Sequence, residues 1–242
     1  MQRRDVLMGS GAAFSLILAG CAGDDAEDVE GGTRDDDNGT GDDNGSSGSA
    51  DLEIVDHDLV VEEGAFSTDI YVAATVENSG DEPSGDIELQ ADWYDSDGNY
   101  LDNDAGRLTS LEAGETWSAR VYHHGSGTED VEDYELEGEF DEDAHEPADG
   151  LTLADSTMEV RDDELVVEGE IENETGEEQS YVEIVAKVYD EDGVALGDEW
   201  TNVTDLRADE TWAFDVEYFS ADIRNRIDEA EDHDILIKDS SW

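Results

Sequence analysis

The sequence predicts an all-β protein with two tandem immunoglobulin-like antiparallel β-sandwich domains that follow a disordered acidic tether. Three observations predict this class. The stretch Trp93–Gly98 returns in a related form as Val188–Gly193, 95 positions later, which indicates a duplicated folding unit. In both copies apolar residues recur at every second position, as in half-buried strands. The segment in front of the copies is rich in Asp, Gly, Asn and Ser, a composition that cannot build a core.

The constant spacing sets the expected domain boundaries. The 95-residue offset also relates Asn78 to Asn173 and Trp117 to Trp212, so these landmarks have no insertion between them. We predict a first domain over residues 51–141, a polar linker over 142–150 and a second domain over 151–242.

The charge is extreme. The 242 residues include 71 acidic and 11 basic ones, for a formal charge of −60. Nucleic acid is therefore excluded as an expected partner, because its phosphates would be repelled. An acidic, lysine-poor surface around patterned strands resembles haloarchaeal proteins, for which molar salt shortens the screening length to about 3 Å. An ordinary acidic secreted protein is the alternative.

The N-terminus carries export signals. Arg3 and Arg4 precede an apolar run, which resembles a twin-arginine (Tat) signal peptide. The run, residues 6–19, is shorter than the roughly 20 residues of a membrane span. It ends in a segment that resembles a lipobox, formed by Leu18, Ala19, Gly20 and Cys21. The sequence therefore predicts a signal peptide over 1–20 and a lipid on Cys21 that holds the protein at the extracellular face of the cytoplasmic membrane. The alternative for this single cysteine is a free thiol on an uncleaved anchor.

Residues 21–50 form the predicted disordered tether, in which like charges favour extension. Four Asn-x-Ser/Thr patterns are candidate N-glycosylation sites, at Asn38, Asn44, Asn173 and Asn202.

Each repeat is expected to hold about seven short strands. Two opening strands are predicted at 51–55 and 59–61, and similar ones at 151–153 and 158–160. Trp117 and Trp212 are expected to be buried on the late strand of each repeat. A helical turn is predicted over Thr128–Tyr134 with Thr128 as its N-cap, and a short helix over Ser220–Ala230 with Ser220 as its N-cap.

Both repeats resemble FxLYD domains, small β-sandwiches of prokaryotic surface proteins and lipoproteins. The first copy carries Val76-Glu77-Asn78, Ala91-Asp92-Trp93-Tyr94-Asp95, Gly98 and Leu111-Glu112-Ala113-Gly114-Glu115-Thr116. The second carries Ile171-Glu172-Asn173, Ala186-Lys187-Val188-Tyr189-Asp190, Gly193 and Leu206-Arg207-Ala208-Asp209-Glu210-Thr211. Both copies have Ala where the family name places Phe, and Asp209 replaces a turn glycine. The resemblance implies a β-sandwich and brings no catalytic residues.

The candidate chemistry is sparse. The two Asp-Gly stretches, 95–98 and 190–193, are interpreted as hairpin turns, with a weak cation site as the alternative. His123 and His124 should point to opposite faces of a strand and so not share a metal ion. Tyr94 and Tyr189 should cap strand ends by packing on the turn and hydrogen-bonding through the hydroxyl.

We predict no catalytic residue, no metal site and no cofactor. The expected function is a non-enzymatic interaction or spacer module in high salt, whose partners are the membrane, through Cys21, and an unknown surface protein or solute. The alternative is a solute- or cation-binding accessory protein of a transporter or membrane complex.

Overall fold

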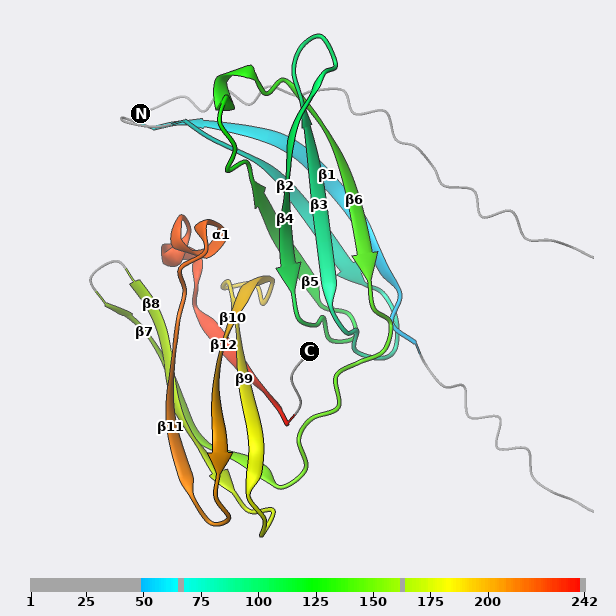
Figure 1. The fold of residues 1–242 in the computed structure, drawn as a ribbon. Coiled ribbons are helices and arrows are strands. Elements are labelled where there is room, and N and C mark those ends of the chain that lie inside the picture. The colour runs from blue at the N-terminus through cyan, green and yellow to red at the C-terminus, as the bar shows by residue number, and fades with distance from the viewer. Residues whose placement is uncertain (1–48, 65–67, 162–163, 240–242) are drawn as a thin grey trace, which may run out of the picture. The chain divides into compact units, whose positions relative to one another are not determined.

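The computed structural model describes residues 49–64, 68–161 and 164–239 and is mostly β (Figure 1). The first repeat contains β1 (Leu52–Glu63), β2 (Thr68–Asn78), β3 (Ile87–Tyr94), β4 (Tyr100–Leu108), β5 (Thr116–Tyr122) and β6 (Asp133–Phe140). The second contains β7 (Leu151–Arg161), β8 (Glu164–Asn173), β9 (Gln179–Tyr189), β10 (Ala195–Leu206), β11 (Thr211–Glu217) and β12 (Asp232–Lys238). The predicted all-β class is confirmed.

The strands form three sheets. The largest has the order β1-β2-β5-β10-β9-β12 and takes three strands from each repeat. The other two have the orders β4-β3-β6 and β11-β8-β7. Within each repeat the strand pairs are antiparallel, and the only parallel pair in the described residues joins β5 to β10 across the repeats.

Each repeat has its own apolar core. In the first, alternate residues of β3 are buried, including Leu89 and Trp93, and they pack with Val76 and Trp117. In the second, Leu165, Ile171, Ile184 and Val188 are buried in an equivalent cluster. Because a strand sends successive side chains to opposite faces, each cluster lies between two sheets, in a sandwich-like arrangement.

The opening of each repeat differs from the prediction. β1 and β7 are each one long strand, and the two short strands expected in each place are wrong. The pairing with the next strand shifts between Ile54 and Asp56 in β1, and between Leu153 and Asp155 in β7. This bulge changes the phase of the apolar pattern without ending the strand, which is why the sequence reads as two segments.

A buried asparagine holds the end of β2. The Asn78 Nδ2 donates to the carbonyl oxygens of Glu82 and Leu111, both at 2.9 Å, and its Oδ1 accepts from the backbone N–H groups of Asp51 and Gly80 at 3.1 Å. Asn173 Nδ2 donates in the same way to Glu177 and Leu206, so this position serves one structural purpose in both repeats.

The helical segments are shorter than predicted. A single 3₁₀ turn covers Thr128–Asp130, with Gly127 and not Thr128 at the N-cap. The second repeat has α1 (Ala221–Arg224) and a 3₁₀ turn at Ile227–Glu229 in place of one helix. Ser220 does stand at the N-cap of α1, but its hydroxyl makes no capping hydrogen bond.

Candidate functional site

The predicted anchor and signal residues Arg3, Arg4, Leu18, Ala19, Gly20 and Cys21 lie outside the described residues, as do Asn38 and Asn44. The other two glycosylation candidates differ in exposure. Asn202 is exposed on β10, whereas Asn173 is 1% exposed and its amide nitrogen donates to backbone carbonyls. The folded second repeat therefore leaves no room for a glycan on Asn173.

The Asp-Gly stretches form the predicted hairpin turns. The Asp95 Oδ1 accepts from the backbone N–H groups of Asp97 and Asn99, both at 2.9 Å. Hydrogen bonds from the Asn99 side chain, together with these backbone bonds, hold the pKa of Asp95 below its usual value. Asp190 makes the matching pair of bonds, and Gly98 and Gly193 supply the positive φ that the turns need. Each first aspartate is thus occupied within its own turn.

The histidine pair does not behave as strand neighbours. β5 ends at Tyr122, and the Nδ1 atoms of His123 and His124 each lie 3.3 Å from an oxygen of the same carboxylate, that of Asp104. The expectation of opposite orientations is therefore wrong. The Asp104 Oδ2 also accepts from the Trp93 indole N–H at 2.9 Å. Across the described parts of the chain, no group of three or more His, Cys, Asp or Glu is arranged to hold a metal ion.

The two repeats meet where β5 runs beside β10. Trp117 pairs with Ala195, and its indole Nε1 donates to the carbonyl oxygen of Leu196 at 3.3 Å. Ala195 is fully buried and belongs to the core cluster of the first repeat, although the second repeat supplies it. The junction is therefore a packed contact and not only a linker.

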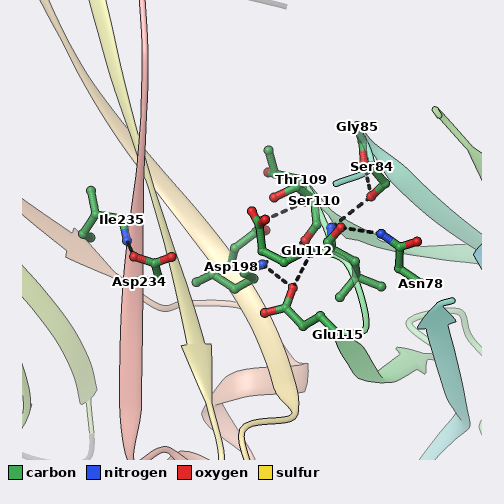
Figure 2. Close-up of polar contacts among 12 residues, drawn as sticks. Asn78, Ser84, Gly85, Thr109, Ser110, Glu112, Glu115, Asp198, Asp234 and Ile235 are labelled. Carbon is green, nitrogen blue, oxygen red and sulfur yellow. Dashed lines mark hydrogen bonds and ion pairs between the residues drawn. The ribbon is translucent and has the colours of Figure 1, made fainter. Parts of the chain in front are cut away.

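A lysine–glutamate pair closes this junction on one side (Figure 2). The Lys187 Nζ lies 2.7 Å from the Glu115 Oε2 and donates to the Ser110 carbonyl oxygen at 3.1 Å. The two side chains are only 9% and 11% exposed. Glu115 is oriented by its own turn, because the same Oε2 accepts from the Glu112 N–H at 2.8 Å. Removing one partner of such a shielded pair costs more than removing one partner of a surface ion pair, because the remaining charge is left poorly solvated.

Two carboxylates of β10 lie close to this pair. The Asp198 Oδ2 accepts from the Thr109 N–H at 2.7 Å, which is a further bond between the repeats (Figure 2). Burial raises the pKa of Asp198 to about 6. Burial, with the negative charges of Asp222 and Asp198, also raises the pKa of Glu199 to about 6.

Two arginines connect the repeats on the other side of the junction. The Arg226 guanidinium donates to the Leu196 carbonyl oxygen and, at 3.2 Å, to the Ser118 hydroxyl. Burial lowers the pKa of Arg226 to about 10. Arg120 lies 3.3 Å from Glu229. Together with the bonds from β10, these contacts join β5 to the second repeat along its length.

The junction uses a large share of the scarce basic residues. The described residues contain Arg107, Arg120, Arg161, Lys187, Arg207, Arg224, Arg226 and Lys238 as their only lysines and arginines. Three of them, Arg120, Lys187 and Arg226, connect the repeats. In a chain with so few cations this placement is a signal that sequence reasoning missed.

A cavity of about 280 Å³ lies beside the Lys187–Glu115 pair. Its apolar wall includes Leu151, Val185 and Leu236, and its polar wall includes the carboxylates of Glu112, Asp198 and Asp234 together with Lys187, whose charge is paired with Glu115. Such a space could hold a small solute with an apolar body and a positive charge.

Tyr94 and Tyr189 differ in their surroundings. The Tyr94 hydroxyl donates to the Glu135 Oε2 at 2.9 Å, as the strand-end interpretation predicts for its hydroxyl. Tyr189 packs against the core of the first repeat, and Lys187 lies over its ring at 5.5 Å. Burial raises the pKa of Tyr189 well above its usual value. Tyr189 is thus a junction residue, which its shared motif with Tyr94 did not reveal.

Compared with known proteins, the sequence matches no protein-family model and no curated protein. In the described part of the chain, none of the helices has the length and apolarity needed to cross a membrane.

Proposed function

We propose that this protein is a non-enzymatic surface lipoprotein whose two immunoglobulin-like, FxLYD-like sandwiches act as an interaction or spacer module in high salt. The lipid on Cys21 would hold it at the extracellular face of the cytoplasmic membrane, and the acidic segment 21–50 would hold the sandwiches away from the lipid. The observation that carries the proposal is the Lys187–Glu115 pair, which is shielded from water and joins the repeats. A spacer needs such a joint, because two freely jointed domains would not keep a distance.

The membrane anchor is tested by Cys21→Ser. The variant should leave the detergent phase in a partition assay and appear in the medium, since one thiol carries the whole anchor. A Cys21→Ser chain that still partitions with membranes would contradict the lipoprotein assignment.

The spacer role is tested at the joint. Lys187→Asp places a carboxylate against Glu115 and should separate the repeats, which small-angle X-ray scattering in molar salt would record as an increased radius of gyration. Arg207→Asp, which makes the same charge change in the exposed turn before β11, is the control for a change of charge. Equal scattering of Lys187→Asp and the unmodified chain would contradict a joint held by this pair.

The second candidate is a solute- or cation-binding accessory protein of a transporter or membrane complex. It is favoured by the cavity beside Lys187, whose polar wall carries the carboxylates of Glu112, Asp198 and Asp234. Calorimetric titration with Na⁺, K⁺, Mg²⁺, Ca²⁺ and small organic ammonium ions should then give a saturable heat that Asp198→Asn removes. The absence of saturable heat with all of them would dismiss this candidate.

A further inference from the structure

The same strand edge is occupied in the first repeat and open in the second. β5 lies between β2 and β10, and its second edge pairs with β10 at one position, Trp117 with Ala195. β11 occupies the equivalent position, with Thr211 standing 95 residues after Thr116. β11 pairs with β8 on one side and is the outermost strand of its sheet; β10 passes near it, but within the described residues no strand pairs with its outer edge. An open strand edge is a template for another strand.

The tryptophans at these two edges reflect the difference. Trp117 is 1% exposed and donates its indole N–H to Leu196 of the neighbouring repeat. Trp212 is half-buried, packs beside Phe214 with ring centroids 5.7 Å apart, and makes no indole hydrogen bond within the described residues. The side chain that completes the contact in the first repeat therefore remains partly at the surface in the second.

The charges around the open edge indicate which charged side chains a partner must carry. Glu210 takes the place of Glu115, and its Oε2 accepts from the Arg207 N–H at 3.0 Å, as Glu115 does from Glu112. Its nearest cation is the exposed Arg207 at 4.0 Å, whereas Glu115 has Lys187 at 2.7 Å. Asp215 takes the place of Arg120. Two acids thus face a site where the first repeat combines an acid with a base.

A second copy of this chain fits the site poorly. The surface of its first repeat that would have to imitate β9 and β10 carries Asp92 at the position of Lys187 and the exposed Tyr100 at the position of Ala195. Asp92 would face Glu210 with like charge, and the Tyr100 ring would occupy the space that a methyl group needs beside Trp212. The contact between the repeats is therefore not repeated from chain to chain.

We propose that the β11 edge, Thr211–Glu217 with Trp212, docks the edge strand of a different β-sheet protein. The docking strand places a small residue beside Trp212, as Ala195 is placed beside Trp117, and brings basic side chains to Glu210 and Asp215. This inference rests on the proposed interaction role and names the surface and the chemistry of the partner.

The test uses a synthetic hairpin with the sequence of residues 183–200, which contains Lys187 and Ala195 in their native order. Its hairpin fold in molar salt is first established by its own cross-strand NMR contacts. It is then titrated into the isotope-labelled full chain. Amide shifts should concentrate on β11 and on the turn before it. Shifts that are absent at millimolar hairpin, or that fall on β1, β4 or β7, would overturn the proposal.

Matched variants test whether the hairpin binds at the β11 edge. Glu210→Lys places a like charge against the Lys187 of the hairpin and should weaken hairpin binding about tenfold, and Asp192→Lys, which makes the same charge change in a remote exposed turn, should leave it unchanged. A hairpin made with Lys187→Asp should also bind more weakly by a similar factor. Equal binding by Glu210→Lys and Asp192→Lys would overturn the site. A natural partner that bound both variants equally would preserve the interaction role while removing this surface from it.

Discussion

At the scale of single residues, the contact between the repeats depends on a few cations. Lys187 is one of two lysines in the chain, and its ammonium group compensates the poorly exposed carboxylate of Glu115. Lys187→Met removes the charge but keeps most of the aliphatic stem, so it leaves Glu115 without its partner. We expect the free energy of unfolding in molar salt to fall by about 3 kcal/mol, as measured by denaturant titration.

The matched double variant separates the pair from the packing. Lys187→Met combined with Glu115→Gln should recover most of the loss, because the amide oxygen can still accept from the Glu112 N–H and no buried charge remains. A single-variant loss below about 0.5 kcal/mol would instead place the pair with exposed ion pairs, which contribute little.

A second residue-scale prediction concerns Asp209. It takes the place of Gly114 and holds a φ of 60°, close to the 78° of that glycine. The left-handed region is unfavourable for a residue with a Cβ. Asp209→Gly should therefore raise the unfolding free energy by about 0.5 to 1 kcal/mol.

Gly114→Asp provides the reciprocal comparison. A Cβ at Gly114 would meet no atom within 4 Å, so only the backbone conformation opposes the substitution. It should lower thermal stability by a similar amount. A stabilised Gly114→Asp chain would contradict the conformational explanation.

At the scale of elements, the pattern of alternation was sufficient for some strands and not for others. β3 could be predicted because every second residue from Ile87 to Trp93 is apolar and buried. β1 and β7 could not be predicted as single strands, because a bulge shifts the phase within each. The orientations of His123 and His124 were predicted wrongly because β5 ends at Tyr122, and no change in the apolar pattern of the sequence marks that end.

The junction could not be predicted from the repeat pattern. Trp117 and Trp212 occupy equivalent positions, and equal burial was expected for both, which is wrong. The burial of Trp117 is completed by Ala195 and Leu196 of the other repeat, so it depends on a contact between repeats that a 95-residue periodicity does not contain. The usable signal was the position of the rare lysine, Lys187.

The β10 carboxyls predict a pH effect. The pKa values of Asp198 and Glu199 rise to about 6 in the folded chain, so each group binds its proton more tightly there than in the unfolded chain. Their contribution to stability is complete near pH 4 and is lost as the pH rises through about 6. The denaturant concentration at the unfolding midpoint, measured in molar salt, should therefore decrease as the pH is raised from 4 to 7.

The double variant Asp198→Asn/Glu199→Gln assigns this effect. In this variant the decrease in the free energy of unfolding between pH 4 and pH 7 should be smaller by about 2 kcal/mol. The asparagine oxygen still accepts from the Thr109 N–H. Asp95 and Glu168, whose pKa values are lowered by hydrogen bonds, act in the opposite direction in both chains and cancel in the comparison. Parallel profiles for the double variant and the unmodified chain would contradict the assignment to β10.

At the scale of the whole molecule, charge repulsion opposes folding. A formal charge of −60 is carried by 242 residues, and the two cores must overcome the repulsion among carboxylates that folding brings together. In 1 M salt the screening length is about 3 Å, and at 0.01 M it is about 30 Å, comparable to the size of a small domain. Dialysis into millimolar salt should therefore abolish the β-sheet circular dichroism signal, and returning the salt should restore it.

Protonation distinguishes charge repulsion from a general effect of salt on apolar burial. In millimolar salt at pH 4, a large part of the carboxylates is neutral, so the β-sheet signal should return without added salt. If molar salt acted only by strengthening apolar contacts, lowering the pH would not restore the fold. A β-sheet signal that was unchanged between molar and millimolar salt at neutral pH would contradict both explanations and would mean that the two cores outweigh the repulsion unaided.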